Sequence, residues 1–207
     1  MKKPEKFWDF ISGVFAKKPM DDEQLFGETV LYIKQHLHPN SVVLDCGCGT
    51  GTLSNAISDN VQKINAIDIS GKMLNIAKAR SLSLNKNNIE YLQTSIYDNT
   101  FKENTFDIIF AFNVFHFIED SNRFLTRVSE LLTPNGIFIS STPCLRESRR
   151  FSSEFMNVLS KLGVIPKIKM LTFFELEKLI SKAPFEILDK KTNSEIPRDY
   201  IILAKSV

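Results

Sequence analysis

The chain has 207 residues, of which 43% are hydrophobic and 24% are charged, and its formal net charge is +2. This length and composition predict one globular domain with a sizeable core, and the charge excludes the strongly basic field of a dedicated nucleic-acid-binding protein. Three cysteines make neither a disulfide framework nor a metal-ligand set, so we expect free thiols, no bound metal and a cytoplasmic location.

Residues 1–39 are expected to form two helices that are split near Pro19 and cap the rest of the fold. The first helix has an amphipathic pattern whose apolar positions are interrupted by polar residues, and this pattern is not that of a signal peptide. Its apolar positions are Phe7, Trp8, Phe10, Ile11, Val14 and Phe15. The longest apolar stretch, residues 108–118, is too short to span a bilayer, so no stable membrane insertion is expected.

Residues 42–51 read Val-Val-Leu-Asp-Cys-Gly-Cys-Gly-Thr-Gly, which predicts a buried strand followed by a glycine-rich loop. A dinucleotide-binding loop would need a glycine at position 52, where Thr52 stands, so a nicotinamide-dependent oxidoreductase is disfavoured. The spacing of Asp45, Gly47, Gly49 and Gly51 resembles motif I of the class I S-adenosylmethionine (SAM)-dependent methyltransferases. A plain strand-to-helix turn is the alternative.

The resemblance implies a cofactor role for each part of this loop. Asp45 holds the ammonium of the methionine moiety, directly or through water, and the backbone of Gly47, Cys48 and Gly49 passes against the cofactor. Gly51 closes the motif. SAM is the implied cofactor and S-adenosyl-L-homocysteine the implied product.

A second buried strand is predicted over residues 64–70, and it ends in Asp68. An acid at this place in a doubly wound fold accepts hydrogen bonds from ribose hydroxyls. The alternative is that Asp68 caps the following helix, although Ser70 is an equally good cap. By resemblance, Ile69 and Met73 pack on the adenine, whereas core packing is the alternative for Met73.

Residues 90–98 predict a third strand and its exit loop. Many members of the family that this chain resembles carry an acid at the position of Ser95. The resemblance therefore implies that Ser95 and the backbone N–H of Ile96 bind the adenine. Asp98 is the nearest acid, and it could equally be a solvated loop residue.

Residues 106–116 predict the fourth strand and resemble the corresponding motif of the ubiquinone/menaquinone C-methyltransferase type. The resemblance implies that Asn113 belongs to the cofactor site and that His116 lies where the acceptor sits. His116 is the candidate general base, and the alternative is a histidine packed among phenylalanines. Asn113–His116 do not form the motif of exocyclic-amine methylation, so no nucleic-acid substrate is implied.

The rest of the chain predicts a helix that ends at Pro134, a turn at Asn135–Gly136 and a fifth strand. An insertion over residues 144–170 is expected to carry a helix, with a further helix at 175–182. Two last strands, 185–190 and 200–205, are expected to form an antiparallel hairpin. Cys144 loosely resembles the nucleophile of pyrimidine C5-methyltransferases, and a buried thiol is the alternative.

Together with the resemblance, these patterns predict an α/β, Rossmann-like class I methyltransferase fold. The resemblance implies a mostly parallel seven-stranded sheet in the order 3-2-1-4-5-7-6, with strand 7 antiparallel and helices on both faces. We expect one domain, 1–207, with a helical cap (1–39), a SAM-binding core (40–142), an acceptor lid (144–170) and a helix with the terminal hairpin (171–207).

The resemblance implies transfer of a methyl group to a small, partly apolar acceptor, with Phe15, His116 and Cys144 as candidate acceptor contacts. Phe15 stands where near relatives often have a tyrosine. A SAM-binding sensor or partner subunit without transfer activity is the alternative, because an intact cofactor loop serves both functions.

Overall fold

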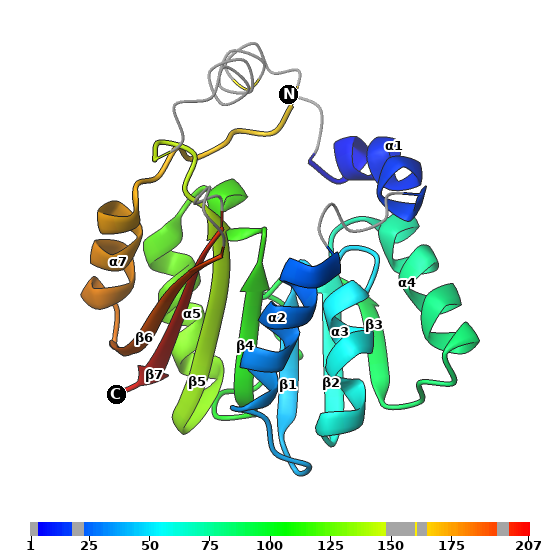
Figure 1. The fold of residues 1–207 in the computed structure, drawn as a ribbon, viewed down its shortest axis with the longest axis horizontal. Helices are drawn as coiled ribbons and strands as arrows, with labels where there is room; N and C mark the ends of the chain where they lie inside the picture. The colour runs from blue at the N-terminus through cyan, green and yellow to red at the C-terminus, as the bar shows by residue number, and fades with distance from the viewer. Residues whose placement is uncertain (1–3, 18–22, 148–159, 161–164, 194–198) are drawn as a thin grey trace. The chain divides into compact units, whose positions relative to one another are not determined.

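The computed structural model describes residues 4–17, 23–147, 160, 165–193 and 199–207 (Figure 1). Seven strands form one sheet in the order β3-β2-β1-β4-β5-β7-β6, in which β7 runs antiparallel to both of its neighbours. The predicted fold class and strand order are therefore confirmed. By its contacts the chain divides into two compact units, residues 2–98 and 99–207.

The unit of residues 2–98 holds three parallel strands with the helices that connect them. Its elements are α1 (Pro4–Lys17), α2 (Glu23–Lys34), β1 (Val42–Cys46), α3 (Thr52–Ile57), η1 (Ser58–Asn60), β2 (Lys63–Asp68), α4 (Gly71–Ser83) and β3 (Ile89–Gln93). In register, Asp45 lies beside Ala66, and Asp68 lies beside Gln93. Since parallel strands end at the same edge of a sheet, the loops that follow Asp45 and Asp68 meet there.

The unit of residues 99–207 holds the other four strands. Its elements are β4 (Phe106–Phe112), η2 (Phe115–Phe117), α5 (Ser121–Leu131), β5 (Leu132–Pro143), α7 (Phe173–Lys182), β6 (Phe185–Asn193) and β7 (Asp199–Ser206). β4 and β5 are parallel, and β6 and β7 form the expected antiparallel hairpin. Figure 1 shows α5 and α7 beside these strands.

A row of phenylalanines runs through the core of this second unit. The ring of Phe124 in α5 lies between those of Phe115 and Phe138, with centroid distances of 5.8 and 6.5 Å, and Phe138 reaches Phe185 at 5.6 Å. These centroid distances lie in the range that aromatic rings favour. This row of rings joins η2, α5, β5 and β6.

Two helix boundaries differ from the prediction. Helix α5 ends at Leu131 rather than at Pro134, because the residue before a proline disfavours helical backbone and the proline lacks an N–H donor. The predicted turn is present, with Asn135 at φ 66°. Helix α7 begins at Phe173, two residues early, because Thr172 and Glu175 form a capping box.

The helix expected within the 144–170 insertion falls on residues 148–159 and 161–164, which lie outside the described residues. Of the described residues, no helix is both long and apolar enough to cross a membrane.

Candidate functional site

The loop after β1 is fixed to the end of β2 by three backbone donors. The N–H groups of Gly47 and Cys48 both donate to the carbonyl oxygen of Ile67, at 2.8 and 3.0 Å. The N–H of Gly49 donates to Asp68 Oδ2 at 3.0 Å. The glycine loop and the second-strand acid, which the sequence predicted separately, therefore form one structure.

All three glycines of the motif have left-handed backbone, with φ of 74° at Gly47, 53° at Gly49 and 72° at Gly51. Their surroundings differ. A Cβ on Gly49 would meet no atom within 4 Å, whereas one on Gly51 would lie 2.5 Å from Tyr91 Oη and 2.9 Å from Ala77 Cβ. Gly49 thus lies on the open side of the loop, and Gly51 is packed against α4 and β3.

Behind Gly51 lies a buried polar network that sequence reasoning missed. The hydroxyls of Tyr91 and Ser81 are 2.9 Å apart, and Asn55 Nδ2 donates to Tyr91 Oη at 3.2 Å and to the Gly51 carbonyl at 2.7 Å. Ser81 in turn donates to Asn55 Oδ1 at 2.9 Å. The network satisfies buried polar groups and holds the loop's last turn in place.

Asp45 is almost fully buried at the end of β1. Its Oδ2 accepts a 2.5 Å hydrogen bond from Ser54 Oγ in α3. Burial raises the pKa of Asp45 to about 6; the Ser54 hydrogen bond opposes this, and the negative charge of Asp68 adds to it. An approaching cation would stabilise the ionised form of this carboxyl.

Asp68 uses both carboxylate oxygens at the loop. Oδ2 accepts from Gly49, and Oδ1 accepts from the N–H of Ser70 at 2.8 Å. Burial raises the pKa of Asp68, and the N–H donors oppose that shift. The cap of α4 is Ser70, whose Oγ accepts from Met73 N at 3.2 Å, so the alternative of Asp68 as the helix cap does not hold.

An acid from α1 joins this site, which the sequence did not reveal. Asp9 Oδ1 accepts a 2.6 Å hydrogen bond from Ser70 Oγ and a 3.2 Å hydrogen bond from the N–H of Lys72. These donors lower the pKa of Asp9, with the Ser70 hydroxyl as the largest cause. The only signal in the sequence was an acid that interrupts an apolar helical pattern.

The residues assigned to adenine surround the same loops. Ile69 is exposed and Met73 is buried, and the side chain of Gln93 donates to the Ile69 carbonyl at 3.1 Å. After β3, Ser95 is exposed and Ile96 is buried. Asp98 is held by Thr94, whose hydroxyl donates to Asp98 Oδ2 at 2.6 Å.

In the second unit, Asn113 and His116 follow β4. Asn113 has φ 55°, and its N–H donates to the Ser141 carbonyl of β5 at 2.8 Å, which turns the chain into η2. His116 is 5% exposed, its ring centroid is 4.0 Å from that of Phe117, and burial lowers its pKa to about 4. Within the described part of the chain, His116 Nδ1 has no hydrogen-bond partner.

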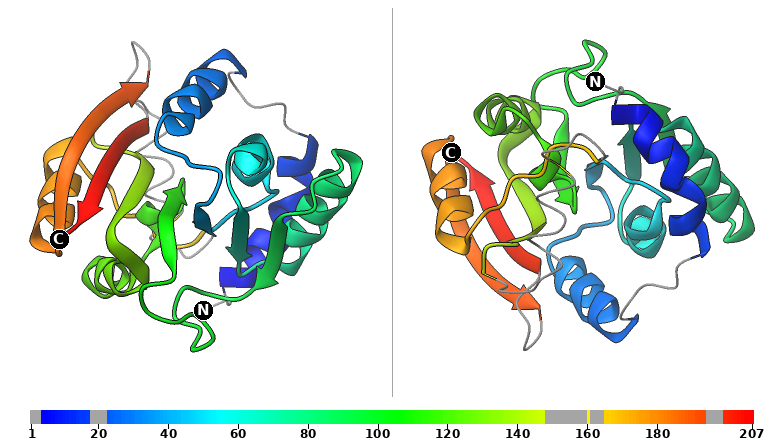
Figure 2. Two further views of the ribbon diagram at one scale, coloured as in Figure 1. Left: turned by 90° about the horizontal axis from the view of Figure 1, so that it is seen from below. Right: turned by 90° about the horizontal axis from the view of Figure 1, so that it is seen from above.

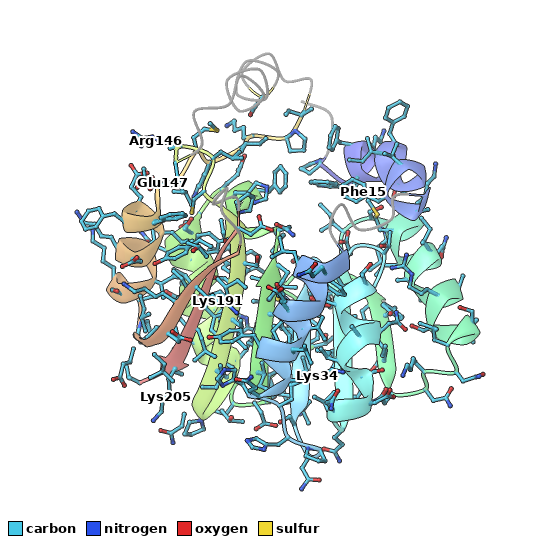
Figure 3. All side chains as sticks on the ribbon, viewed as in Figure 1. Phe15, Lys34, Arg146, Glu147, Lys191 and Lys205 are labelled. Atoms are coloured by element: carbon cyan, nitrogen blue, oxygen red, sulfur yellow. The ribbon has the colours of Figure 1, made fainter. Side chains whose placement is uncertain are left out.

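Cys144 is fully buried just after β5, and burial, with Glu147 and other acids adding to it, raises the pKa of its thiol to about 12. A protonated thiol is a poor nucleophile. The segment behind it is tied to α7, where Arg146 pairs with Glu175 at 2.6 Å and Glu147 accepts from the N–H of Phe173 at 2.9 Å (Figure 3).

Phe15, the third candidate acceptor contact, lies near the end of α1 (Figure 3). It is 45% exposed, and its ring centroid is 6.4 Å from that of Trp8 in an edge-on arrangement.

A groove of about 530 Å³ lies at the amino-terminal ends of β1, β2 and β3, where Lys63 and Glu90 form a 2.7 Å ion pair. Open α/β sheets bind ligands at the carboxyl ends of their strands, so this groove is not the candidate cofactor site. No group of three metal-ligating side chains occurs among the described residues.

Comparison with known proteins identifies the family. Residues 37–185 match a family model described as a methyltransferase domain. This chain belongs to that family, the class I SAM-dependent methyltransferases. As a methyltransferase domain it is 30% identical over 166 residues to the demethylmenaquinone methyltransferase of Lactococcus lactis, a match that covers 75% of this chain and 63% of that protein.

The mitochondrial ubiquinone biosynthesis O-methyltransferase of Schizosaccharomyces pombe is 27% identical over 139 residues, which is 66% of this chain and 50% of that protein. The chain thus spans between half and two thirds of the length of these curated relatives. A SAM-dependent methyltransferase from Aquifex aeolicus shares the fold, with a TM-score of 0.72, 21% identity and coverage of 94% of this chain and 98% of that one.

The described residues fit SAM, the cofactor of this family. Both Asp68 oxygens accept backbone N–H donors, and because a carboxylate offers about four lone-pair sites, capacity is left for the hydroxyls of a ribose. Gly49, on the open side of the loop, leaves room beside that carboxylate where a side chain would intrude.

Proposed function

We propose that this methyltransferase domain transfers the methyl group of SAM to a small, partly apolar acceptor. The observation that supports this best is the hydrogen bond from the Gly49 N–H to Asp68, which brings the glycine loop and the proposed ribose-binding acid together. SAM supplies a methyl group on a sulfonium, so alignment of the acceptor in a dry pocket accounts for most of the catalysis.

We assign the cofactor contacts as follows. Asp68 accepts from the ribose hydroxyls, and Asp45 with the backbone of Gly47, Cys48 and Gly49 receives the methionine end. Gly51 supports the loop from behind. The nucleobase and the remaining edge of the cofactor fall to Ile69, Met73, Ser95, Ile96 and Asn113.

His116 is the proposed catalytic residue. Because its pKa is lowered to about 4, the imidazole is neutral at physiological pH. It can accept a hydrogen bond or a proton at Nδ1, for which the described residues offer no hydrogen-bond partner. With this pKa the imidazole of His116 is a weak base, because its protonated form gives up the proton readily. His116 therefore suits a methyl acceptor whose hydroxyl is acidic. Phe15 and Cys144 are the further proposed acceptor contacts.

The curated relatives named above act in quinone biosynthesis or on demethylmenaquinone, which supports an acceptor with an apolar part. In this proposal residues 1–39 cap the cofactor and residues 144–170 close over the acceptor, within one functional domain. The absence of a basic field favours a small molecule over nucleic acid, and the three free cysteines favour the cytoplasm.

The test is transfer of labelled methyl from SAM by the purified chain to fractions of a metabolite extract. We expect label in one small-molecule fraction, and calorimetry should show binding of SAM and S-adenosyl-L-homocysteine but not of NAD. Binding of SAM with no transfer to any fraction would support the sensor alternative, and tight binding of NAD would contradict the proposal.

A further inference from the structure

Helix α1 is joined to α4 through the polar side of α1. Asp9 binds Ser70 and the N–H of Lys72, and Ser12, one turn further on, is buried and donates to the Asp9 carbonyl at 2.8 Å. Figure 2 shows the two helices side by side in both views. This contact decides which side of α1 faces away from α4.

The side that faces away is apolar. Phe10 is 86% exposed and Val14, one turn later, is 62% exposed, and a Cβ on Gly13 between them would meet no atom within 4 Å. Lys6, which is exposed, stands four residues before Phe10. By helical spacing Lys6, Phe10 and Val14 form one row along α1, which we call the outer row.

An ordinary helix on a globular domain leaves polar residues on its outer side, whereas Phe10 and Val14 occupy the outer side of α1. Helices that lie in the plane of a membrane surface present such a side: an apolar strip that includes Phe, and lysines that reach the lipid headgroups. The sequence adds further lysines at positions 2, 3, 17 and 18, against Glu5 and Asp9 before Pro19, and more acids follow at 21–23.

We propose that the outer row is a membrane-surface contact that lays this domain on a bilayer containing anionic lipid. The apolar part of the row enters the headgroup boundary, and Lys6 faces lipid phosphates. Such a helix lies on the bilayer without spanning it, which agrees with the lack of a spanning helix among the described residues.

The experiment mixes the full chain with phosphatidylcholine vesicles, with and without phosphatidylglycerol, and measures the fraction of the chain that sediments with the vesicles. We expect co-sedimentation that is stronger with phosphatidylglycerol. Absence of co-sedimentation with either vesicle overturns the proposal, and equal binding to both overturns its anionic part.

Variants separate a lipid contact on α1 from general stickiness and from self-association of the chain. Phe10→Ser should lower the vesicle partition coefficient about tenfold, whereas Phe174→Ser, at a 71% exposed position of α7, should leave it unchanged. Lys6→Glu should lower binding roughly tenfold only when phosphatidylglycerol is present. An equal loss in Phe174→Ser overturns the proposal. The proposal is also overturned if Phe10→Ser changes the sedimentation velocity of the chain but not its binding to vesicles. That result would assign the outer row to contact with a second copy of the chain.

Discussion

The carboxylate of Asp9 in α1 accepts a hydrogen bond from Ser70 Oγ, while the N–H of that same Ser70 donates to Asp68. One serine therefore links the N-terminal helix to the acid at the end of β2. The link also completes the start of α4, since Ser70 caps Met73 and Asp9 accepts from Lys72. The position of α1 is thus tied to the ribose-type carboxylate.

Replacement of Asp9 should destabilise the contact between α1 and the start of α4. Asp9→Ala leaves the N–H of Lys72 and the Ser70 hydroxyl without their acceptor, and we expect a loss of about 1–2 kcal/mol in the free energy of unfolding by urea. Asp9→Asn, which keeps an acceptor oxygen, should recover part of it. Asp59→Ala, which removes an exposed ion pair with Lys86, is the control and should cost less. Equal costs for the Asp9 and Asp59 variants would contradict this role.

Two glycines of the loop should respond differently to the same change. Gly49→Ala meets open space and should cost roughly 1–2 kcal/mol of backbone strain. Gly51→Ala carries the same strain and adds overlap with Tyr91 Oη and Ala77 Cβ, so it should cost about 1–3 kcal/mol more. Urea unfolding of both variants measures the difference, and a Gly51 variant as stable as the Gly49 variant would refute the packing role of Gly51.

The raised pKa of Asp45 predicts a pH-dependent stability. The folded pKa, about 6, lies above the ordinary value of 3.8, so the contribution of Asp45 is fully present below pH 3.8 and is lost as the pH rises through 6. Asp45→Asn lacks this loss, so its stability relative to the natural chain should rise by up to about 3 kcal/mol on going from acid to mildly alkaline pH. Urea unfolding across that range, with Asp59→Asn as the exposed control, gives the measurement. Parallel pH profiles for the natural chain and Asp45→Asn would contradict it.

The sequence predicted most of the fold because its signals are local and repeated. Buried strands that carry Asp45 and Asp68 near their carboxyl ends, with glycines or a helix after them, specify parallel strands and crossovers without distant information. Pro197 and the polar stretch around it separated the last two strands into the hairpin that the structure contains. The strand order followed from the resemblance, and the structure has the same order.

What the sequence missed depends on partners far apart in the chain. Asp9 meets Ser70 across 61 residues, and Tyr91 meets Asn55 across 36, and neither pair has a local pattern. The capping box of Thr172 and Glu175 is different, since its local signature was present and would have placed the start of α7 correctly. The roles of the individual site residues stay predictions until they are tested.

Asp68 is the acid whose loss should reduce cofactor binding most clearly. Asp68→Ala removes a charge-assisted acceptor of the proposed ribose contact, worth about 1.5–3 kcal/mol, so SAM affinity should fall by one to two orders of magnitude. Asp68→Ala also frees the N–H of Gly49, so circular dichroism must show that the variant is folded. Calorimetry with SAM, with Asp59→Ala as control, decides the matter, and unchanged affinity would remove Asp68 from the site.

His116 can be tested at two levels. In an NMR titration its imidazole should remain neutral down to a pH of about 4, whereas in the urea-unfolded chain the same ring should regain the ordinary pKa of 6.5.

His116→Asn should lower kcat, with SAM affinity unchanged, because no cofactor contact is assigned to its side chain. If the acceptor must lose a proton, the loss should be larger at low pH than at high pH, where the acceptor ionises unaided. His38→Asn, at an exposed histidine, serves as the matched control. Equal kcat at every pH would instead make His116 a packed core residue, held by Phe117 and by its backbone bond to Lys169.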